Sequence, residues 1–201
     1  MTSQPGFEPN SDRATLSVLL AGDLWFSCTL WQYNGRLRRG MVVVQRIALV
    51  PQIRAVVMFR FSQVAFRSKF GRPVAYLLRS RIMRGAAADI HPGATVGPGL
   101  NLLHSVGVVI GRFVVAGRDL AVHQNVTIGD NGRELGQPVI GDHVFIGAGA
   151  KLLGPIRVGD RSRIGANAVV LSDVPSDCVA VGAPARSRAR AEKPDAPHSA
   201  S

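Results

Sequence analysis

The chain has 201 residues, 46% of them hydrophobic, a formal net charge of +11 and two cysteines, Cys28 and Cys178. This length allows a substantial core, and two cysteines without CxxC spacing argue against a disulfide framework, so we expect reduced, structural thiols. No stretch approaches the roughly 18 apolar residues of a membrane-spanning helix, and the polar start is unlike a signal peptide, so we expect a cytoplasmic protein.

The positive charge is concentrated before residue 89. Residues 1–88 hold 13 Lys and Arg against 3 Asp and Glu, whereas residues 89–184 hold 7 against 8. A solvated basic face accounts for this excess, and peripheral contact with an anionic membrane or an acidic polymer is the alternative. We do not expect nucleic acid as a partner, because no recognised binding motif or aromatic-rich platform accompanies the charge.

The N-terminal part of the chain is predicted to be helical. Residues 1–14 are polar and aperiodic, which indicates disorder. A basic α-helical region is expected over residues 15–88. It begins with a helix from Leu16 to Tyr33, and two or three shorter helices follow, broken at Pro51 and at Gly71 to Pro73. We expect these helices to pack on the first coil of the next domain and to cover its open strand edge.

One segment of this region, Gln52 to Phe70, combines arginines and a lysine with valines and phenylalanines. This composition suits an amphipathic helix on a membrane surface. It equally suits a helix that packs on a core or interface, which is the interpretation we favour here.

From Ile90 to Val174, an aliphatic residue recurs at every sixth position, usually followed by glycine. A helix would repeat every three or four residues and a strand every two, whereas a period of six is typical of the hexapeptide repeats of a parallel β-helix. Each unit is one short strand plus a corner, and three units complete one turn of a triangular prism with rungs about 4.8 Å apart. The inward anchors are Ile90, Val96 and Leu102; Ile110, Ala116, Val122 and Ile128; and Ile140, Ile146, Leu152, Val158, Ile164 and Val170.

We therefore predict a β-helix domain over residues 89–184, with one irregular insertion and a tail. Residues 129–139, GDNGRELGQPV, fall between two phases of the repeat and are polar and turn-rich. They indicate a loop that projects from the prism, where binding groups are often carried. Residues 185–201, rich in alanine, arginine and proline, read as a flexible tail.

His104 and Asp89 are the first candidates for chemistry. His104 lies among aliphatic residues, where an imidazole has no evident structural role, and a neutral imidazole can accept a proton near neutral pH. Asp89 precedes it by 15 residues, close to one turn of three hexapeptides. It could therefore stack on an adjacent coil and accept the other N–H of the imidazole. A hydrogen-bonded structural histidine is the alternative.

A metal site formed by His104, His123 and His143 was also weighed. These histidines are 19 and 20 residues apart, again near one turn, and three neutral imidazoles can bind zinc. Their places within the repeat differ, so their side chains should point in different directions, and we expect no metal.

Four segments carry a resemblance to a known family: ADIHPGATVGPGL, LLHSVGVVIG, VHQNVTIG and VIGDHVFIGAGAKLLGPIRVGDRSRIGANAVVLSDVPSDCVAVGAPAR. In order and spacing they resemble the serine O-acetyltransferase family of left-handed β-helix acyltransferases, over residues 89–186. Colanic-acid-type polysaccharide acetyltransferases share much of the pattern and are close competitors. The resemblance implies a left-handed parallel β-helix preceded by a short α-helical region.

The resemblance also implies a site. His104 matches the general base, and Asp89 matches the carboxylate that orients it. The base would take the proton of an acceptor hydroxyl as its oxygen attacks the thioester of acetyl-CoA, and main-chain N–H groups would stabilise the oxyanion. The family is trimeric, with sites shared between neighbouring subunits, which implies a homotrimer. The residues that fall where the family binds coenzyme A are Gly129, Ala148, Arg163 and Ala166.

Departures from the family concern the acceptor. Leu103 stands where serine-specific members carry an aspartate, and Gly136, Gln137 and Pro138 stand where they carry Arg-His-Pro. A small zwitterion needs charged partners, so these changes should weaken its binding.

The sequence thus predicts an acetyl-CoA-dependent O-acetyltransferase. L-Serine, converted to O-acetyl-L-serine in cysteine biosynthesis, is the expected acceptor. A sugar hydroxyl of an exopolysaccharide, or a specialised metabolite, is the alternative. A non-catalytic β-helix scaffold is a third hypothesis, of another class.

Overall fold

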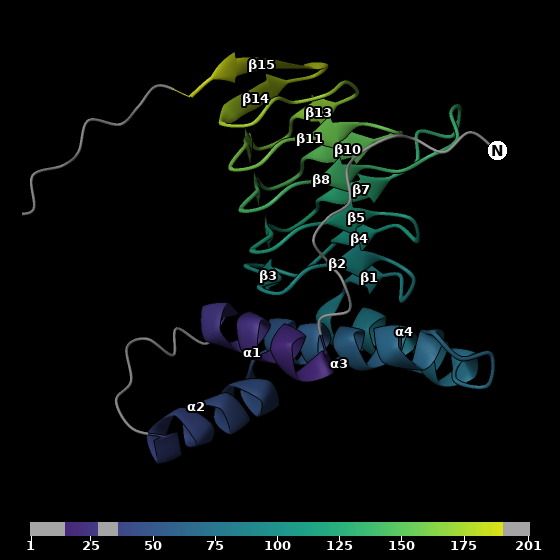
Figure 1. The fold of residues 1–201 in the computed structure, drawn as a ribbon, viewed down its shortest axis with the longest axis vertical. Helices are drawn as coiled ribbons and strands as arrows, with labels where there is room; N and C mark the ends of the chain where they lie inside the picture. The colour runs from purple at the N-terminus through teal and green to yellow at the C-terminus, as the bar shows by residue number, and fades with distance from the viewer. Residues whose placement is uncertain (1–14, 28–35, 191–201) are drawn as a thin grey trace, which may run out of the picture.

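The computed structural model describes residues 15–27 and 36–190 (Figure 1). The disorder predicted for residues 1–14, the end of the first helix beyond residue 27, Cys28 and residues 191–201 all lie outside the described residues. The helices are α1 (Leu16–Ser27), α2 (Arg36–Leu49), α3 (Pro51–Phe66) and α4 (Arg72–Ala86). Their breaks fall where the sequence suggests them, since Pro51 opens α3 and Gly71 precedes α4.

The rest of the described chain forms a parallel β-helix of short strands. The strands are β1 (Asp89–Ile90), β2 (Thr95–Val96), β3 (Asn101–Leu102), β4 (Val109–Ile110), β5 (Val115–Ala116), β6 (Ala121–Val122), β7 (Thr127–Gly129), β8 (Val139–Ile140), β9 (Phe145–Ile146), β10 (Lys151–Leu153), β11 (Arg157–Val158), β12 (Arg163–Ile164), β13 (Val169–Val170), β14 (Cys178–Gly182) and β15 (Ala185–Ala189).

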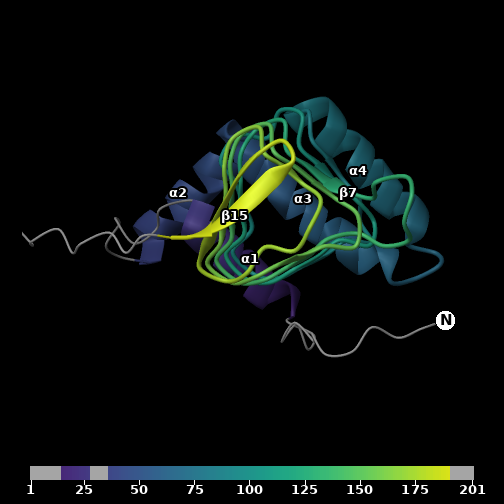
Figure 2. The same cartoon turned by 90° about the horizontal axis from the view of Figure 1, so that it is seen from above.

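These strands build the three faces of a prism. The first sheet has the order β1-β4-β7-β10-β13, the second β11-β8-β5-β2, and the third β15-β14-β12-β9-β6-β3. Seen along its axis, the prism shows coils that superpose around a triangular outline (Figure 2). The predicted aliphatic anchors are all buried inside it, which confirms the hexapeptide interpretation. Stacked anchors remove a continuous apolar column from water, and this burial stabilises the coils.

Both ends of the prism are covered. Helices α1, α3 and α4 lie across the end that begins with β1 (Figure 1). At the other end β15 pairs antiparallel with β14, from Cys178 opposite Ala189 to Gly182 opposite Ala185. The prediction of a flexible tail from residue 185 is therefore wrong for Ala185–Ala189. Its alternation of small and basic residues suits a strand with one exposed face, and pairing satisfies the last strand edge of the third sheet.

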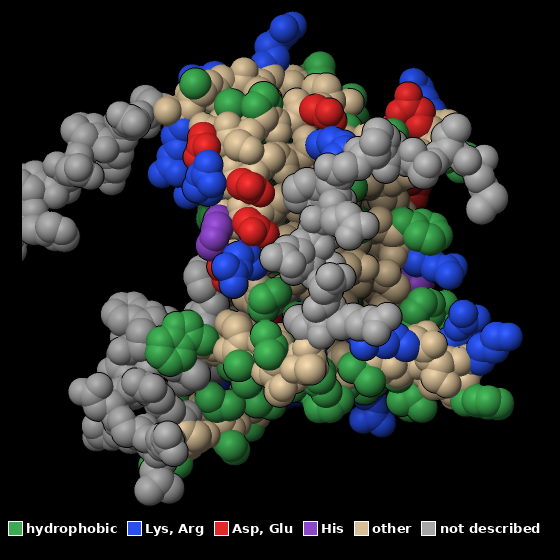
Figure 3. Space-filling view, in the orientation of Figure 1, with side chains coloured by type: hydrophobic (Ala, Val, Ile, Leu, Met, Phe, Trp, Pro, Cys, Tyr) green, Lys and Arg blue, Asp and Glu red, His purple; other side chains and the backbone are tan. Residues whose placement is uncertain are grey.

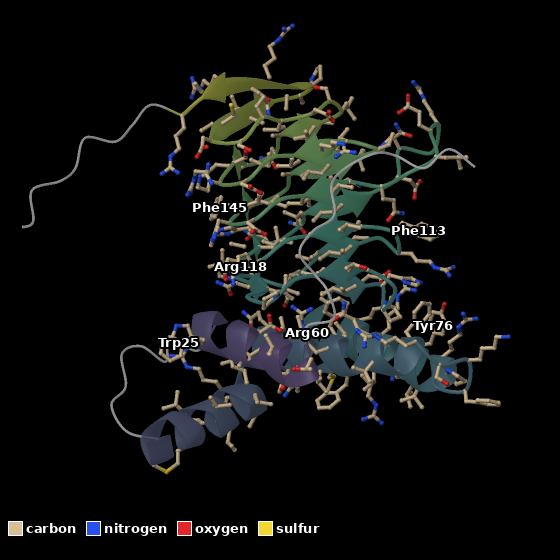
Figure 4. All side chains as sticks on the ribbon, viewed as in Figure 1. Trp25, Arg60, Tyr76, Phe113, Arg118 and Phe145 are labelled. Carbon is tan, nitrogen blue, oxygen red and sulfur yellow. The ribbon has the colours of Figure 1, made fainter. Side chains whose placement is uncertain are left out.

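A buried ion pair fastens the helices to the first coil. The Arg60 Nε and Nη2 donate to the two carboxylate oxygens of Asp23 at 2.7 and 3.0 Å, and both residues are almost completely buried. Arg60 also donates to the carbonyls of Val96 and Gly97, and the Asp23 Oδ1 accepts the N–H groups of Gly99 and Leu100. Arg60 therefore lies between the helices and the prism (Figure 4).

The surface differs between the two parts of the molecule. Acidic and basic side chains both lie on the prism, whereas hydrophobic and basic side chains gather over the helices (Figure 3). Within residues 15–27 and 36–190, no single helix is long and apolar enough to cross a membrane. Residues 40–49 and 51–66 meet that criterion only as a pair, bent by 97°.

Candidate active site

His104 and two of the predicted coenzyme A residues lie along one edge of the prism. This histidine edge consists of the corners that lead from the third sheet to the first, at residues 103–108, 123–126, 147–150 and 165–168. Backbone hydrogen bonds stack these corners, as between Asn125 N and the Val106 carbonyl (2.8 Å) and between Asn167 N and the Ala148 carbonyl (2.8 Å). His104, Ala148 and Ala166 therefore stand on successive levels of one edge.

A row of rings runs from His104 along the third sheet. The exposed imidazole of His104 lies 5.8 Å from that of His123, centroid to centroid, and the His123 ring lies 5.1 Å from Phe145. The guanidinium of Arg163 lies over the Phe145 ring at 4.2 Å, a cation–π contact. The row links the predicted base to Arg163, the predicted phosphate ligand.

Asp89 does not bond to His104. Its two carboxylate oxygens accept hydrogen bonds from the Nε and Nη2 of Arg79 in α4, at 2.6 and 2.8 Å. The hydrogen bond to Asp89 raises the pKa of Arg79 above its ordinary value. The predicted pairing failed because one turn here takes 20 residues, so that Asp89 stacks on Val109 and not on residue 104. His104 lies in the preceding corner, and Asp89 lies on the face of the first sheet.

The projecting loop lies on a different edge of the prism. Residues 130–138 connect β7 in the first sheet to β8 in the second, so Gly129 and the loop share what we call the loop edge, with corners at 91–94, 111–114, 130–138 and 154–156. Figure 2 shows the loop extending outward beside β7. Within one chain, the predicted residues thus divide between two edges that flank the first sheet.

Gln137 has an internal role in this loop. Its Oε1 accepts the N–H of Phe113 at 2.9 Å, and its Nε2 donates to the Asp130 Oδ2 at 3.3 Å. Gly136 has a φ of +129°, and a Cβ there would lie 2.8 Å from the Pro155 Cβ, so the chain needs glycine at this position. Leu103, beside the base, is exposed and apolar. None of these three residues supplies a charge to an acceptor.

The other histidines are only partly as predicted. His143 lies in a corner between the second and third sheets, where its Nδ1 is 3.2 Å from the Asp119 Oδ2. His104 and His123 face one another, so the expectation that all three point in different directions is wrong for this pair. In the described part of the chain, no group of three or more His, Cys, Asp or Glu is arranged to hold a metal.

An aromatic cluster on the loop edge was not anticipated. The rings of Phe66, Tyr76 and His91 meet edge to face, with centroids 5.6 to 6.0 Å apart. Burial, together with the positive charges of Arg79 and Arg112, lowers the pKa of His91. The His91 Nδ1 accepts the N–H of Gly93 at 2.9 Å. Arg79 and the rings of α3 and α4 reach this cluster through tertiary packing, which no local motif indicates.

Comparisons with known proteins agree with this architecture. Residues 137–172 match the family model "Bacterial transferase hexapeptide (six repeats)". A serine acetyltransferase of Helicobacter pylori (strain J99) is 42% identical over 146 residues, which cover 70% of this chain and 83% of the relative. The structure of a serine acetyltransferase in complex with coenzyme A from Brucella abortus strain S19 has a TM-score of 0.74 and 32% identity, covering 87% of this chain and 68% of that one.

Plant relatives are longer. Serine acetyltransferase 1, chloroplastic, of Arabidopsis thaliana is 45% identical over 123 residues, which cover 60% of this chain and 39% of the relative. The match to the Helicobacter protein, by contrast, extends over most of both chains. On the hexapeptide prism, the helical layer and these similarities, the chain belongs to the serine acetyltransferase family.

Proposed function

We propose that the protein is an acetyl-CoA-dependent O-acetyltransferase with L-serine as its acceptor and His104 as its general base. The observation that carries the proposal is the exposed imidazole of His104 at the head of the histidine edge, in a chain of this family. A neutral imidazole accepts the proton of the acceptor hydroxyl as the oxygen attacks the thioester carbonyl. The products are the O-acetyl ester and free coenzyme A, and no acyl-enzyme is required.

The residues of the histidine edge suit a long, flexible acyl donor. Gly147, Ala148 and Gly149 in one corner, and Gly165 and Ala166 in the next, present little side-chain bulk. An extended pantetheine arm could lie against such corners and hydrogen-bond to their backbone. The exposed Arg163 offers a guanidinium with several donors, the geometry that suits phosphate oxygens.

A homotrimer with shared sites is part of the proposal. Within one chain, the histidine edge and the loop edge lie on opposite sides of the first sheet. Packing prisms side by side would bring the loop edge of one protomer to the histidine edge of its neighbour, which gathers Gly129 and His104 into one groove. Sedimentation equilibrium would then give a mass three times that of the chain, and a monomeric mass would contradict this arrangement.

A sugar hydroxyl is the second candidate acceptor, and one observation favours it. Leu103 is apolar, and both polar ends of the Gln137 side chain are occupied within the loop. A zwitterion would have to find its charged partners elsewhere, whereas a neutral hydroxyl compound needs none at these positions.

The test measures thiol release from acetyl-CoA with L-serine, L-homoserine and a panel of neutral sugars. Serine turnover that exceeds turnover with every sugar supports the proposal. Turnover with sugars alone would replace the acceptor and keep the chemistry. Absence of both thiol release and coenzyme A binding would contradict the enzymatic proposal and favour a scaffold.

A further inference from the structure

The helical layer carries positive charge without acidic residues beyond α1. Between Asp23 and Asp89 the sequence holds 12 Arg and Lys and no Asp or Glu. Most charged surface regions mix both signs, as the prism of this protein does, with 7 basic and 8 acidic residues over residues 89–184. A single-sign surface concentrates an electrostatic field, and its counterpart must be anionic.

The turn between α3 and α4 presents an aromatic side chain to solvent. Phe70 is 96% exposed, although it lies in a short turn between two packed helices. Arg67, Lys69 and Arg72 flank it in sequence, and all three are exposed. Leaving a whole phenylalanine side chain in water forgoes the free energy of its burial. The arrangement of one apolar ring among cations suits insertion at an interface that is apolar inside and anionic outside.

The exposed face of α4 continues this pattern. One side of the helix is buried, through Ala75 and Ile82. The opposite side carries Leu77, Arg81 and Arg84, all exposed and spaced at three or four residues. Exposed apolar residues on α2 extend the surface, and Figure 3 shows hydrophobic side chains along the side of the helical layer that faces away from the prism. These α2 residues are Met41, Val44 and Leu49.

We propose that this helical surface, formed by the Arg67–Arg72 turn and the exposed faces of α2 and α4, docks on an anionic phospholipid bilayer. The charge decides between occupants. A second copy of the chain would bring two basic surfaces together, which electrostatic repulsion disfavours, whereas acidic lipid headgroups complement the surface and the acyl region accepts Phe70 and Leu77. The protein would lie on the membrane with the prism axis pointing away from it. This docking is independent of the proposed reaction.

The experiment measures co-sedimentation of the full chain with vesicles. We expect binding to vesicles of phosphatidylcholine mixed with phosphatidylglycerol, and no binding to phosphatidylcholine alone. Raising the salt from about 0.1 M to 1 M shortens the Debye length from about 10 to 3 Å and should release the protein. Because each cation near an anionic surface strengthens binding about five-fold and an inserted ring about ten-fold, the double variant Lys69→Glu, Phe70→Ser should bind about a hundred-fold more weakly.

The projecting loop provides a matched control. The variant Arg133→Glu, Leu135→Ser makes the same kind of change at exposed positions, since Leu135 is 100% exposed, and it should bind vesicles as the wild type does. The pair Arg81→Glu, Arg84→Glu tests the same surface if the turn variant fails to fold. Equal binding to neutral vesicles, or equal loss in the loop variant, would overturn the proposal. So would a turn variant whose sedimentation mass without lipid differs from that of the wild type, because a second copy would then be the occupant.

Discussion

At the scale of single residues, the candidate site is organised around imidazoles and the arginines near them. His104 has the ring of His123 as a neighbour, and Arg79 holds the carboxylate of Asp89. The composition of NLLHSVG was enough to single out His104, because a polar side chain interrupts an aliphatic pattern. The partner of Asp89 could not be predicted, because Arg79 reaches it from a helix and the corner after β3 adds residues to the turn.

The environment of His91 predicts a pH dependence of stability. Its pKa is lowered from an ordinary value of 6.5, mainly by burial and then by Arg79 and Arg112. Below pH 6.5 the unfolded chain therefore binds a proton that the folded chain resists, so the free energy of unfolding falls as the pH drops from 6.5 through the folded pKa. Above 6.5 this contribution is fully present.

The variant His91→Asn keeps a neutral acceptor for the Gly93 N–H but cannot titrate. Urea unfolding on both sides of pH 6.5 should show a smaller loss of stability at the lower pH in this variant than in the wild type. An identical dependence in both proteins would show that other groups cause it.

At the scale of elements, prolines and glycines placed the helix breaks, and one buried ion pair holds the helices to the prism. Pro51 and Gly71 act locally, through backbone geometry, and are therefore visible in the sequence. The Arg60–Asp23 pair joins residues 37 positions apart, and Arg60 is one of many arginines in its region. Nothing in the pattern distinguished the buried arginine from the exposed ones.

Loss of this pair should destabilise the protein strongly. Arg60→Met would leave the buried carboxylate of Asp23 without its guanidinium, and removing one partner of a buried pair costs about 3–5 kcal/mol. Chemical denaturation should show this as a lower free energy of unfolding. The matched control is Arg161→Met, which breaks the exposed pair with Asp177 and should leave the unfolding transition unchanged. Equal effects of the two substitutions would contradict the role assigned to Arg60.

At the scale of the whole molecule, the six-residue period accounts for the prism, because every anchor from Ile90 to Val170 points inward on one of three sheets. Periodicity reports which side chains are buried, and burial in a solenoid repeats at a constant interval. The strand Ala185–Ala189 breaks the period by turning back antiparallel, so the same reasoning could not find it. The division of the candidate site between two edges was equally invisible, because it depends on which corner each residue occupies.

The account's central claim is that His104 performs the base chemistry of acetyl transfer. Its most direct test is the rate of thiol release from acetyl-CoA with L-serine for the wild type, His104→Ala and His143→Ala. Because general-base catalysis contributes about 10²–10⁴-fold, His104→Ala should lose that factor in kcat, while His143→Ala, which lies in another corner beside Asp119, should keep the wild-type rate. A His104→Ala protein that turns over at the wild-type rate would contradict the claim.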